Sequence, residues 1–194
     1  MVFGVILGIL LWPQPQEAPA PAPKGEVPAS EAFPRTAEGH RITEPKKTKH
    51  VSPEWPADAL RAGLTGRVVL ECVIGTDGRV ENAKVLQGYR SLSEAAAAAV
   101  SKWRYTPTKL DGQPVPVIMT VTVNFRLEHP PKRGELLKSV HESDPEIRWA
   151  AVRWLGRYRP ITAQQKAAIE AALEDSSGLV RTAAKEAQAK LKAE

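Results

Sequence analysis

Alternating apolar and polar residues mark three segments in the middle of the chain and predict a small sheet. Residues 66–74 and 80–86 flank the turn sequence Gly75-Thr76-Asp77-Gly78, so they are expected to pair as a hairpin. Residues 117–127 show the clearest alternation, with one apolar face and one half-exposed face. The apolar face of this third segment consists of Val117, Met119, Val121, Val123, Phe125 and Leu127.

Helical periodicity occurs between the second and third segments. An apolar stripe with spacings of three and four predicts a helix over residues 93–103. The stripe consists of Leu92, Ala96, Ala99, Val100 and Trp103. Consecutive alanines at 95–99 leave little bulk on this helix, so it can lie close against a sheet. A shorter helix is expected to begin in the Pro-bounded sequence at 53–60.

The connections between these elements predict the order of the strands. A helix that links the second and third strands makes a crossover, which places those two strands parallel to each other. The first strand then lies antiparallel between them. The expected fold class is therefore α+β, with a three-stranded antiparallel-type sheet of order 2-1-3, one packed helix and a short N-terminal helix. Pro114 and Pro116 precede the third strand, which favours an edge position for it.

An internal repeat with a period of 33 residues occupies the C-terminal segment. Val140, Glu142, Asp144, Ile147, Arg148, Ala150 and Ala151 align with Leu173, Asp175, Ser177, Val180, Arg181, Ala183 and Ala184. The pattern predicts helices near 134–141, 145–158, 162–174 and 178–192; two unrelated helical hairpins are the alternative. Two repeats are fewer than the three or so needed for independent stability, so we expect them to pack on the α+β domain or on another chain. Trp149 and Trp154 are candidates for that contact, and burial within the repeat is equally consistent with the pattern.

The first 50 residues divide into two segments. Val2 to Trp12 is an apolar run that no Lys or Arg precedes, and at about 1.5 Å per residue it is too short to span a bilayer. We interpret residues 1–12 as a short signal-like or anchor-like segment. The alternatives are the end of a longer export segment and a stray apolar N-terminus. Residues 13–50 are rich in proline and poor in large apolar side chains, which predicts a linker, either polyproline II or disordered.

Composition argues against several classes of function. The net charge of +5 is not concentrated in a stripe, so we expect no nucleic-acid interface. Cys72 is the single cysteine, which excludes an internal disulfide. The four histidines are scattered and no catalytic motif occurs, so we expect no catalytic residue, no metal site and no cofactor. Asp77 and Asp111 are interpreted as turn residues, and Ser91 and Ser93 as helix N-caps.

Several motifs within residues 51–127 occur together in the order typical of one family. They are Pro53-Glu54-Trp55-Pro56-Ala57-Asp58-Ala59-Leu60, Gly66 before the first strand, Asp77-Gly78, the alanine-rich helix, Trp103-Arg104-Tyr105-Thr106-Pro107 and Gly112 before the last strand. Together these residues resemble the C-terminal domain of the TonB family. The segment that follows is similar to the short bacterial HEAT-type repeat. The chain is accordingly divided into residues 1–12, the linker 13–50, a TonB-like domain at 51–129 and a HEAT-like repeat at 133–194.

The resemblance implies a cell-envelope protein that is not an enzyme and that binds an extended peptide of an outer-membrane receptor or transporter, in energy transduction for transmembrane transport. It implies a periplasm-facing location, exported or anchored in the inner membrane, with membrane contact only through the N-terminal segment. The receiving strand would comprise Val117, Ile118, Met119, Thr120, Val121, Thr122, Val123, Asn124 and Phe125. Arg104 is a candidate contact for the partner. The alternative is a structural envelope scaffold that forms a homodimer through the same edge strand.

Overall fold

The computed structural model describes residues 42–192. The expected segment at 1–12 and most of the expected linker lie outside the described residues. Within the described part of the chain, no helix has both the length and the apolar character that crossing a membrane requires. The expectation of a mixed α+β fold is confirmed.

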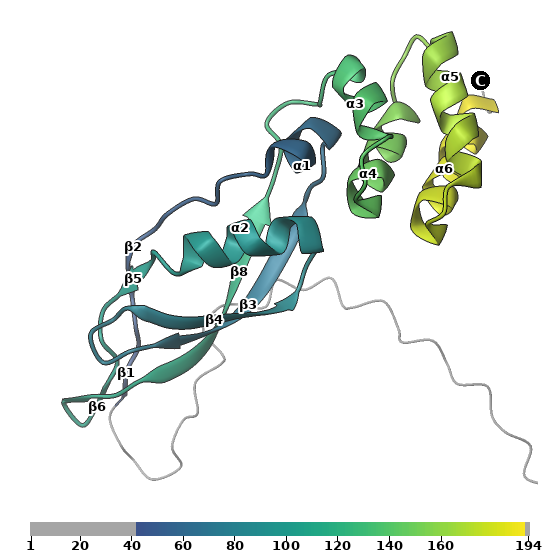
Figure 1. Ribbon diagram of the computed structural model, residues 1–194. Coiled ribbons are helices and arrows are strands. Elements are labelled where there is room, and N and C mark those ends of the chain that lie inside the picture. The colour runs from purple at the N-terminus through teal and green to yellow at the C-terminus, as the bar shows by residue number, and fades with distance from the viewer. Residues whose placement is uncertain (1–41, 193–194) are drawn as a thin grey trace, which may run out of the picture. The chain divides into compact units, whose positions relative to one another are not determined.

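The central sheet contains three strands, β3 (Gly66–Ile74), β4 (Val80–Gln87) and β8 (Val117–Phe125), in the order β4-β3-β8. Both neighbours run antiparallel to β3 (Figure 1). The register of β8 is continuous from Val117, opposite Ile74, to Phe125, opposite Gly66. β8 therefore forms one edge of this sheet along its whole length.

Helix α2 (Arg90–Val100) covers one face of the sheet and contributes the fully buried Leu92, Ala96 and Val100. The predicted bounds of this helix, 93–103, are wrong at both ends, because the helix begins and ends three residues earlier. The N-cap of α2 is the extended Tyr89, with no side-chain cap, and Trp103 lies beyond the helix. The helix ends early because the short strand β5 (Arg104–Tyr105) pairs with an upstream segment and requires extended backbone.

Short strands extend the fold beyond the central sheet. β2 (Lys47–Lys49) pairs with β5, and β1 (Ile42–Thr43), β6 (Lys109–Leu110) and β7 (Gln113–Pro114) form a second small sheet. The expected linker at 13–50 is therefore corrected at its C-terminal end, where residues from 42 onward pair with the domain. These strands were missed because their contacts lie far away in the sequence and their side chains are mostly polar.

The C-terminal part is helical, with α3 (Arg133–Ser139), α4 (Pro145–Leu155), α5 (Ala163–Ala171), the 3₁₀ turn η1 (Ala172–Glu174) and α6 (Gly178–Lys192). Two arginines 33 residues apart make the same contacts. Arg148 donates from Nη1 to the carbonyls of residues 142 and 143, both at 2.8 Å. Arg181 donates from Nη1 to the carbonyls of residues 175 and 176, at 2.6 and 2.9 Å. The sequence period is thus also a period of local structure.

Side chains of α4 join the helical part to the α+β part. Trp154 donates from Nε1 to the carbonyl of Gly63, at the end of α1 (Ala57–Ala62), over 2.9 Å. The ring of Trp149 lies 5.4 Å from that of Tyr89. Both tryptophans therefore take part in the expected contact, and the buried side chains of the two parts form one cluster.

The expected N-cap role of Ser91 and Ser93 is wrong. Ser91 Oγ lies 2.8 Å from carboxylate oxygens of both Asp144 and Glu146 and can donate its one hydrogen to either, so it connects α2 to the start of α4. Ser93 lies inside α2 and donates to the carbonyl of Tyr89 at 2.8 Å. By contrast, Asp77 is a turn residue as expected, because its carboxylate accepts from the amide of Arg79 at 2.9 Å.

Candidate functional site

Side chains of β8 alternate between the two faces of the sheet. Val121, Val123 and Phe125 are buried against the core, whereas the even-numbered positions from 118 to 124 are exposed. On its inner edge β8 pairs with β3 at every position. On its outer edge, no strand among residues 42–192 pairs with it. The outer edge therefore presents backbone N–H and C=O groups that have no ladder partner within the described fold.

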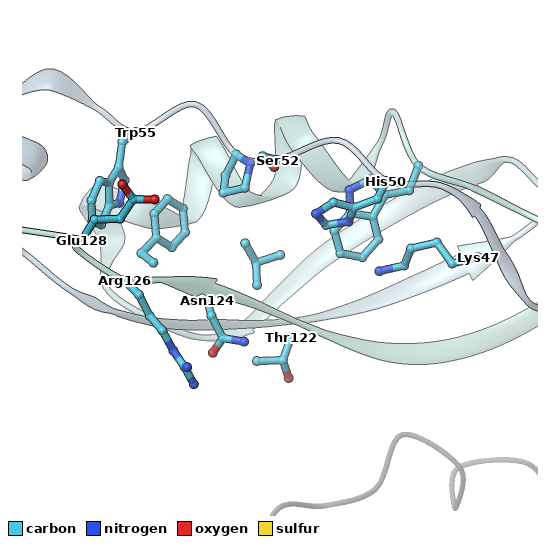
Figure 2. A pocket seen from close by; sticks show the side chains of 12 residues that line it. Lys47, His50, Ser52, Trp55, Thr122, Asn124, Arg126 and Glu128 are labelled. Carbon is cyan, nitrogen blue, oxygen red and sulfur yellow. The ribbon is translucent and has the colours of Figure 1, made fainter.

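A groove of about 570 Å³ runs beside this edge. One wall is β8 itself, from Thr122 to Phe125, and the other is the segment 47–55 (Figure 2). In Figure 2, Lys47, His50 and Trp55 lie on one side of β8. The side chains of Thr122 and Asn124 point away from them, to the other side of the strand. The groove thus lies along the edge of the strand that sequence reasoning selected.

Ring contacts hold the segment 47–55 in place. Trp103 is 2 % exposed and donates from Nε1 to the carbonyl of Val51 over 2.8 Å. The His50 ring lies 4.9 Å from the Trp103 ring, and Trp55 stacks on Phe125 with ring centroids 5.8 Å apart. No backbone hydrogen bond joins this segment to β8 within residues 42–192. The wall contacts β8 through side chains such as Trp55 on Phe125, so it leaves the outer backbone edge of β8 open.

Lys47 places a cation at one end of the groove. Its Nζ lies 3.3 Å from the centroid of the Trp103 ring, a cation–π contact. Partial burial lowers the pKa of Lys47. The groove also contains Arg126 and Glu128 near the end of β8.

Trp55 leaves one polar atom unsatisfied in the wall of the groove. Its Nε1 is buried and has no hydrogen-bond partner among the described residues. Buried polar groups are nearly always hydrogen-bonded, and this donor is one of several buried polar atoms in residues 42–192 that are not. An acceptor supplied from outside the chain would satisfy it.

Arg104, the other sequence-predicted contact, is placed differently. It lies in β5, and its Nη1 donates to the carbonyl of Trp103 at 2.7 Å and to that of Ser101 at 3.4 Å. It is not among the residues that line the groove. Its contact with a partner stays a prediction, since the observed role of its side chain is to bind the backbone after α2.

Sequence reasoning missed the opposite wall of the groove. Lys47 and His50 were assigned to the linker, and Trp55 was read only as part of a helix start. The available signal was a group of cationic and aromatic residues just before the domain, which is more than a linker requires. Within the described residues, no group of three or more His, Cys, Asp or Glu side chains could hold a metal ion.

Fold and groove together define a class of domain: a small α+β unit with one open strand edge. The family model described as the C-terminal domain of the Gram-negative bacterial TonB protein matches residues 51–127. Protein TonB of Xanthomonas campestris pv. campestris (strain B100) is 35 % identical over 77 residues, which cover 39 % of this chain and 34 % of that protein. Protein TonB of Vibrio cholerae serotype O1 is 30 % identical over 80 residues, covering 40 % and 33 %.

The solution NMR structure of the Pseudomonas aeruginosa TonB C-terminal domain is 27 % identical, with a TM-score of 0.39, over 45 % of this chain and 90 % of that one. The chain spans about a third of the length of the Xanthomonas and Vibrio relatives. The family match and the sequence identities show that residues 51–127 are similar to the C-terminal domain of TonB proteins. The expected resemblance is confirmed for that segment.

Proposed function

We propose that residues 51–129 bind an extended peptide of an outer-membrane receptor or transporter by adding it as a strand along β8. The observation that carries this proposal is the open outer edge of β8, which lies beside a groove large enough for side chains. An added strand would pair with the free backbone groups of β8, and its alternate side chains would enter the groove. This is a binding role and not a catalytic one.

The resemblance to TonB proteins also suggests where in the cell the protein acts. The resemblance of residues 51–127 to TonB proteins supports a cell-envelope protein that takes part in energy transduction for transport. In this proposal the domain faces the periplasm, and the apolar segment at 1–12 tethers it or directs its export. The segment between them acts as a spacer.

We further propose that α3–α6 form two HEAT-like repeats. Arg148 and Arg181 make equivalent contacts with the preceding loops, which supports a true repeat over two unrelated hairpins. α1 lies against α3 and α4, where its Arg61 is 3.5 Å from Glu142. In sequence, Glu142 is equivalent to Asp175, the partner of Arg148. The α+β part thus takes the place of a preceding repeat.

Backbone methylation of the peptide tests strand addition directly. The full chain would be titrated by calorimetry with peptides from the periplasmic N-termini of outer-membrane receptors of the same organism. For a peptide that binds, two versions would carry N-methyl groups at the even or at the odd positions. Because alternate N–H groups of a strand point to opposite sides, one version should lose at least 100-fold in affinity and the other much less.

Two outcomes of this titration would count against the proposal. Equal tolerance of both methylated versions would mean that backbone pairing does not drive binding. Absence of saturable binding by every receptor peptide would remove the partner class itself.

A homodimer through the same edge is the second candidate. Ile118, near the start of β8, is 61 % exposed, and a long edge strand that carries an exposed apolar residue is suited to pairing with its own copy. Sedimentation velocity of the full chain distinguishes the two candidates. A dimer that Ile118→Lys abolishes, together with no binding of receptor peptides, would favour the scaffold.

A further inference from the structure

A second cleft lies at the junction of the α+β and helical parts, away from the β8 groove. Its volume is about 140 Å³. Tyr89 and Gly63 line it from the α+β part. Trp149 and Arg153 line it from α4, and Arg157 lines it from the turn after α4. No function proposed so far uses these side chains.

Two cations of this cleft have no acidic partner among residues 42–192. Arg153 stacks over Trp149 with its guanidinium carbon 4.7 Å from the ring centroid, and Arg157 stacks over Trp154 at 5.3 Å. Both arginines are exposed. Neither guanidinium has an ion pair or a hydrogen bond to any residue between 42 and 192.

The walls of the cleft are rigid before any ligand arrives. Trp154 is fixed by its bond to the carbonyl of Gly63, and Trp149 packs against Tyr89. Gly63 has a φ of +68°, and a Cβ there would lie 2.5 Å from Nε1 of Trp154. A guanidinium that lies over a ring still has N–H groups available to an acceptor. The ring contacts therefore pre-position both arginines as donors, which lowers the entropy lost on binding.

We propose that this cleft binds acidic side chains of a peptide segment on a partner protein, at a contact separate from the β8 edge. No acidic residue lines the cleft, whereas two guanidiniums do. Guanidinium and carboxylate match in bidentate geometry, as Arg148 and Asp175 of this same chain show at 2.8 and 2.9 Å. The cleft volume of about 140 Å³ is large enough for the end of an acidic side chain.

Calorimetric titration of the full chain with hexaglutamate at low ionic strength tests this inference. We expect saturable binding with one peptide per chain. Arg153→Gln with Arg157→Gln should weaken it at least tenfold. The matched control is Lys166→Gln with Lys185→Gln, which removes the same charge from exposed positions on α5 and α6 and should leave the affinity within twofold of wild type. Arg153→Lys with Arg157→Lys should restore only part of it, because an ammonium lacks the planar fork.

Three results would overturn the proposal. An equal loss in the lysine control would show general charge attraction, and no saturable binding would show that there is no site. Inorganic phosphate that competes as strongly as hexaglutamate would assign the cleft to phosphate instead. Circular dichroism of each variant checks that the fold is kept. Receptor peptides that occupy the β8 groove should leave hexaglutamate binding unchanged, so failure of this proposal is distinguishable from failure of strand addition.

Discussion

Arg148 connects the two helical pairs of the C-terminal part through one side chain. Its Nε and Nη2 bind both carboxylate oxygens of Asp175, and the two side chains are only 13 % and 12 % exposed. The hydrogen bonds from Arg148 hold the pKa of Asp175 below its usual value. Because the folded pKa is depressed, the pair stabilises the protein above the unfolded pKa of about 4, and this stabilisation is lost as pH falls through the folded value.

Arg148→Ala should lower the free energy of unfolding by about 3 kcal/mol, since it leaves a nearly buried carboxylate without its partner. Urea denaturation at neutral pH measures the change. Arg79→Ala is the matched control, because the ion pair of Arg79 with Asp77 is 67 % and 57 % exposed and should contribute less than about 1 kcal/mol. Similar losses in the two variants would contradict this account of the buried pair.

Cys72 should be inert in the folded protein. It lies in β3 with no exposed surface, and burial raises the pKa of its thiol to about 11. The thiolate, which is the reactive form, is therefore both scarce and inaccessible at pH 8. Iodoacetamide labelling followed by mass spectrometry should show no modification in buffer and complete modification in denaturant. Rapid labelling in buffer would mean that β3 opens readily.

At the scale of elements, predictability depended on whether local sequence or distant contacts determine a boundary. β3 was predicted to the residue because its alternation runs between two glycines. The predicted end of α2 was too late because Trp103 continues the apolar stripe of the helix in the sequence. In the structure Trp103 lies after the helix, where its ring packs against the segment around Val51. β2 had no such local signal, since Lys47, Thr48 and Lys49 are all exposed and the strand exists only through β5. The same holds for the groove. Its β8 wall could be predicted from local alternation, whereas the opposite wall depends on distant contacts and could not.

The end of α1 is the element boundary most sensitive to substitution. Gly63→Ala should cost at least about 2 kcal/mol, because an alanine at φ +68° is strained and its Cβ would meet Trp154 and Pro131. Thermal denaturation measures it. Gly134→Ala in α3 is the control. A Cβ at Gly134 would meet no atom within 4 Å and the backbone there is helical, so this substitution should stabilise the protein by roughly 0.5–1 kcal/mol. A harmless Gly63→Ala would mean that α4 does not pack on α1 as described.

The described chain should unfold as one cooperative unit. One buried cluster includes residues of both parts, and α4 contacts α1, α2 and Tyr89 through hydrogen bonds and rings. We expect a single calorimetric transition whose van't Hoff and calorimetric enthalpies agree. Removal of residues 133–194 should lower the melting temperature of the α+β part by exposing Gly63 and Tyr89. Two separate transitions in the full chain would contradict a shared core.

The whole molecule thus presents two surfaces of different character, a backbone edge at β8 and a cationic, aromatic cleft at the junction with α4. The first can recognise almost any extended peptide through its backbone, with selectivity from the groove. The second depends on charge and should weaken with added salt. Binding at the edge should therefore persist at a salt concentration that abolishes binding in the cleft.

Amide hydrogen exchange of β8 tests the central claim most directly. The exchange rates of Val117–Phe125 would be measured by NMR with and without a saturating receptor peptide. Strand addition predicts strong new protection at alternate residues of β8, those whose N–H groups point to the outer edge, with little change in β4 and α3–α6. New protection confined to other elements, or uniform and weak along β8, would contradict the account.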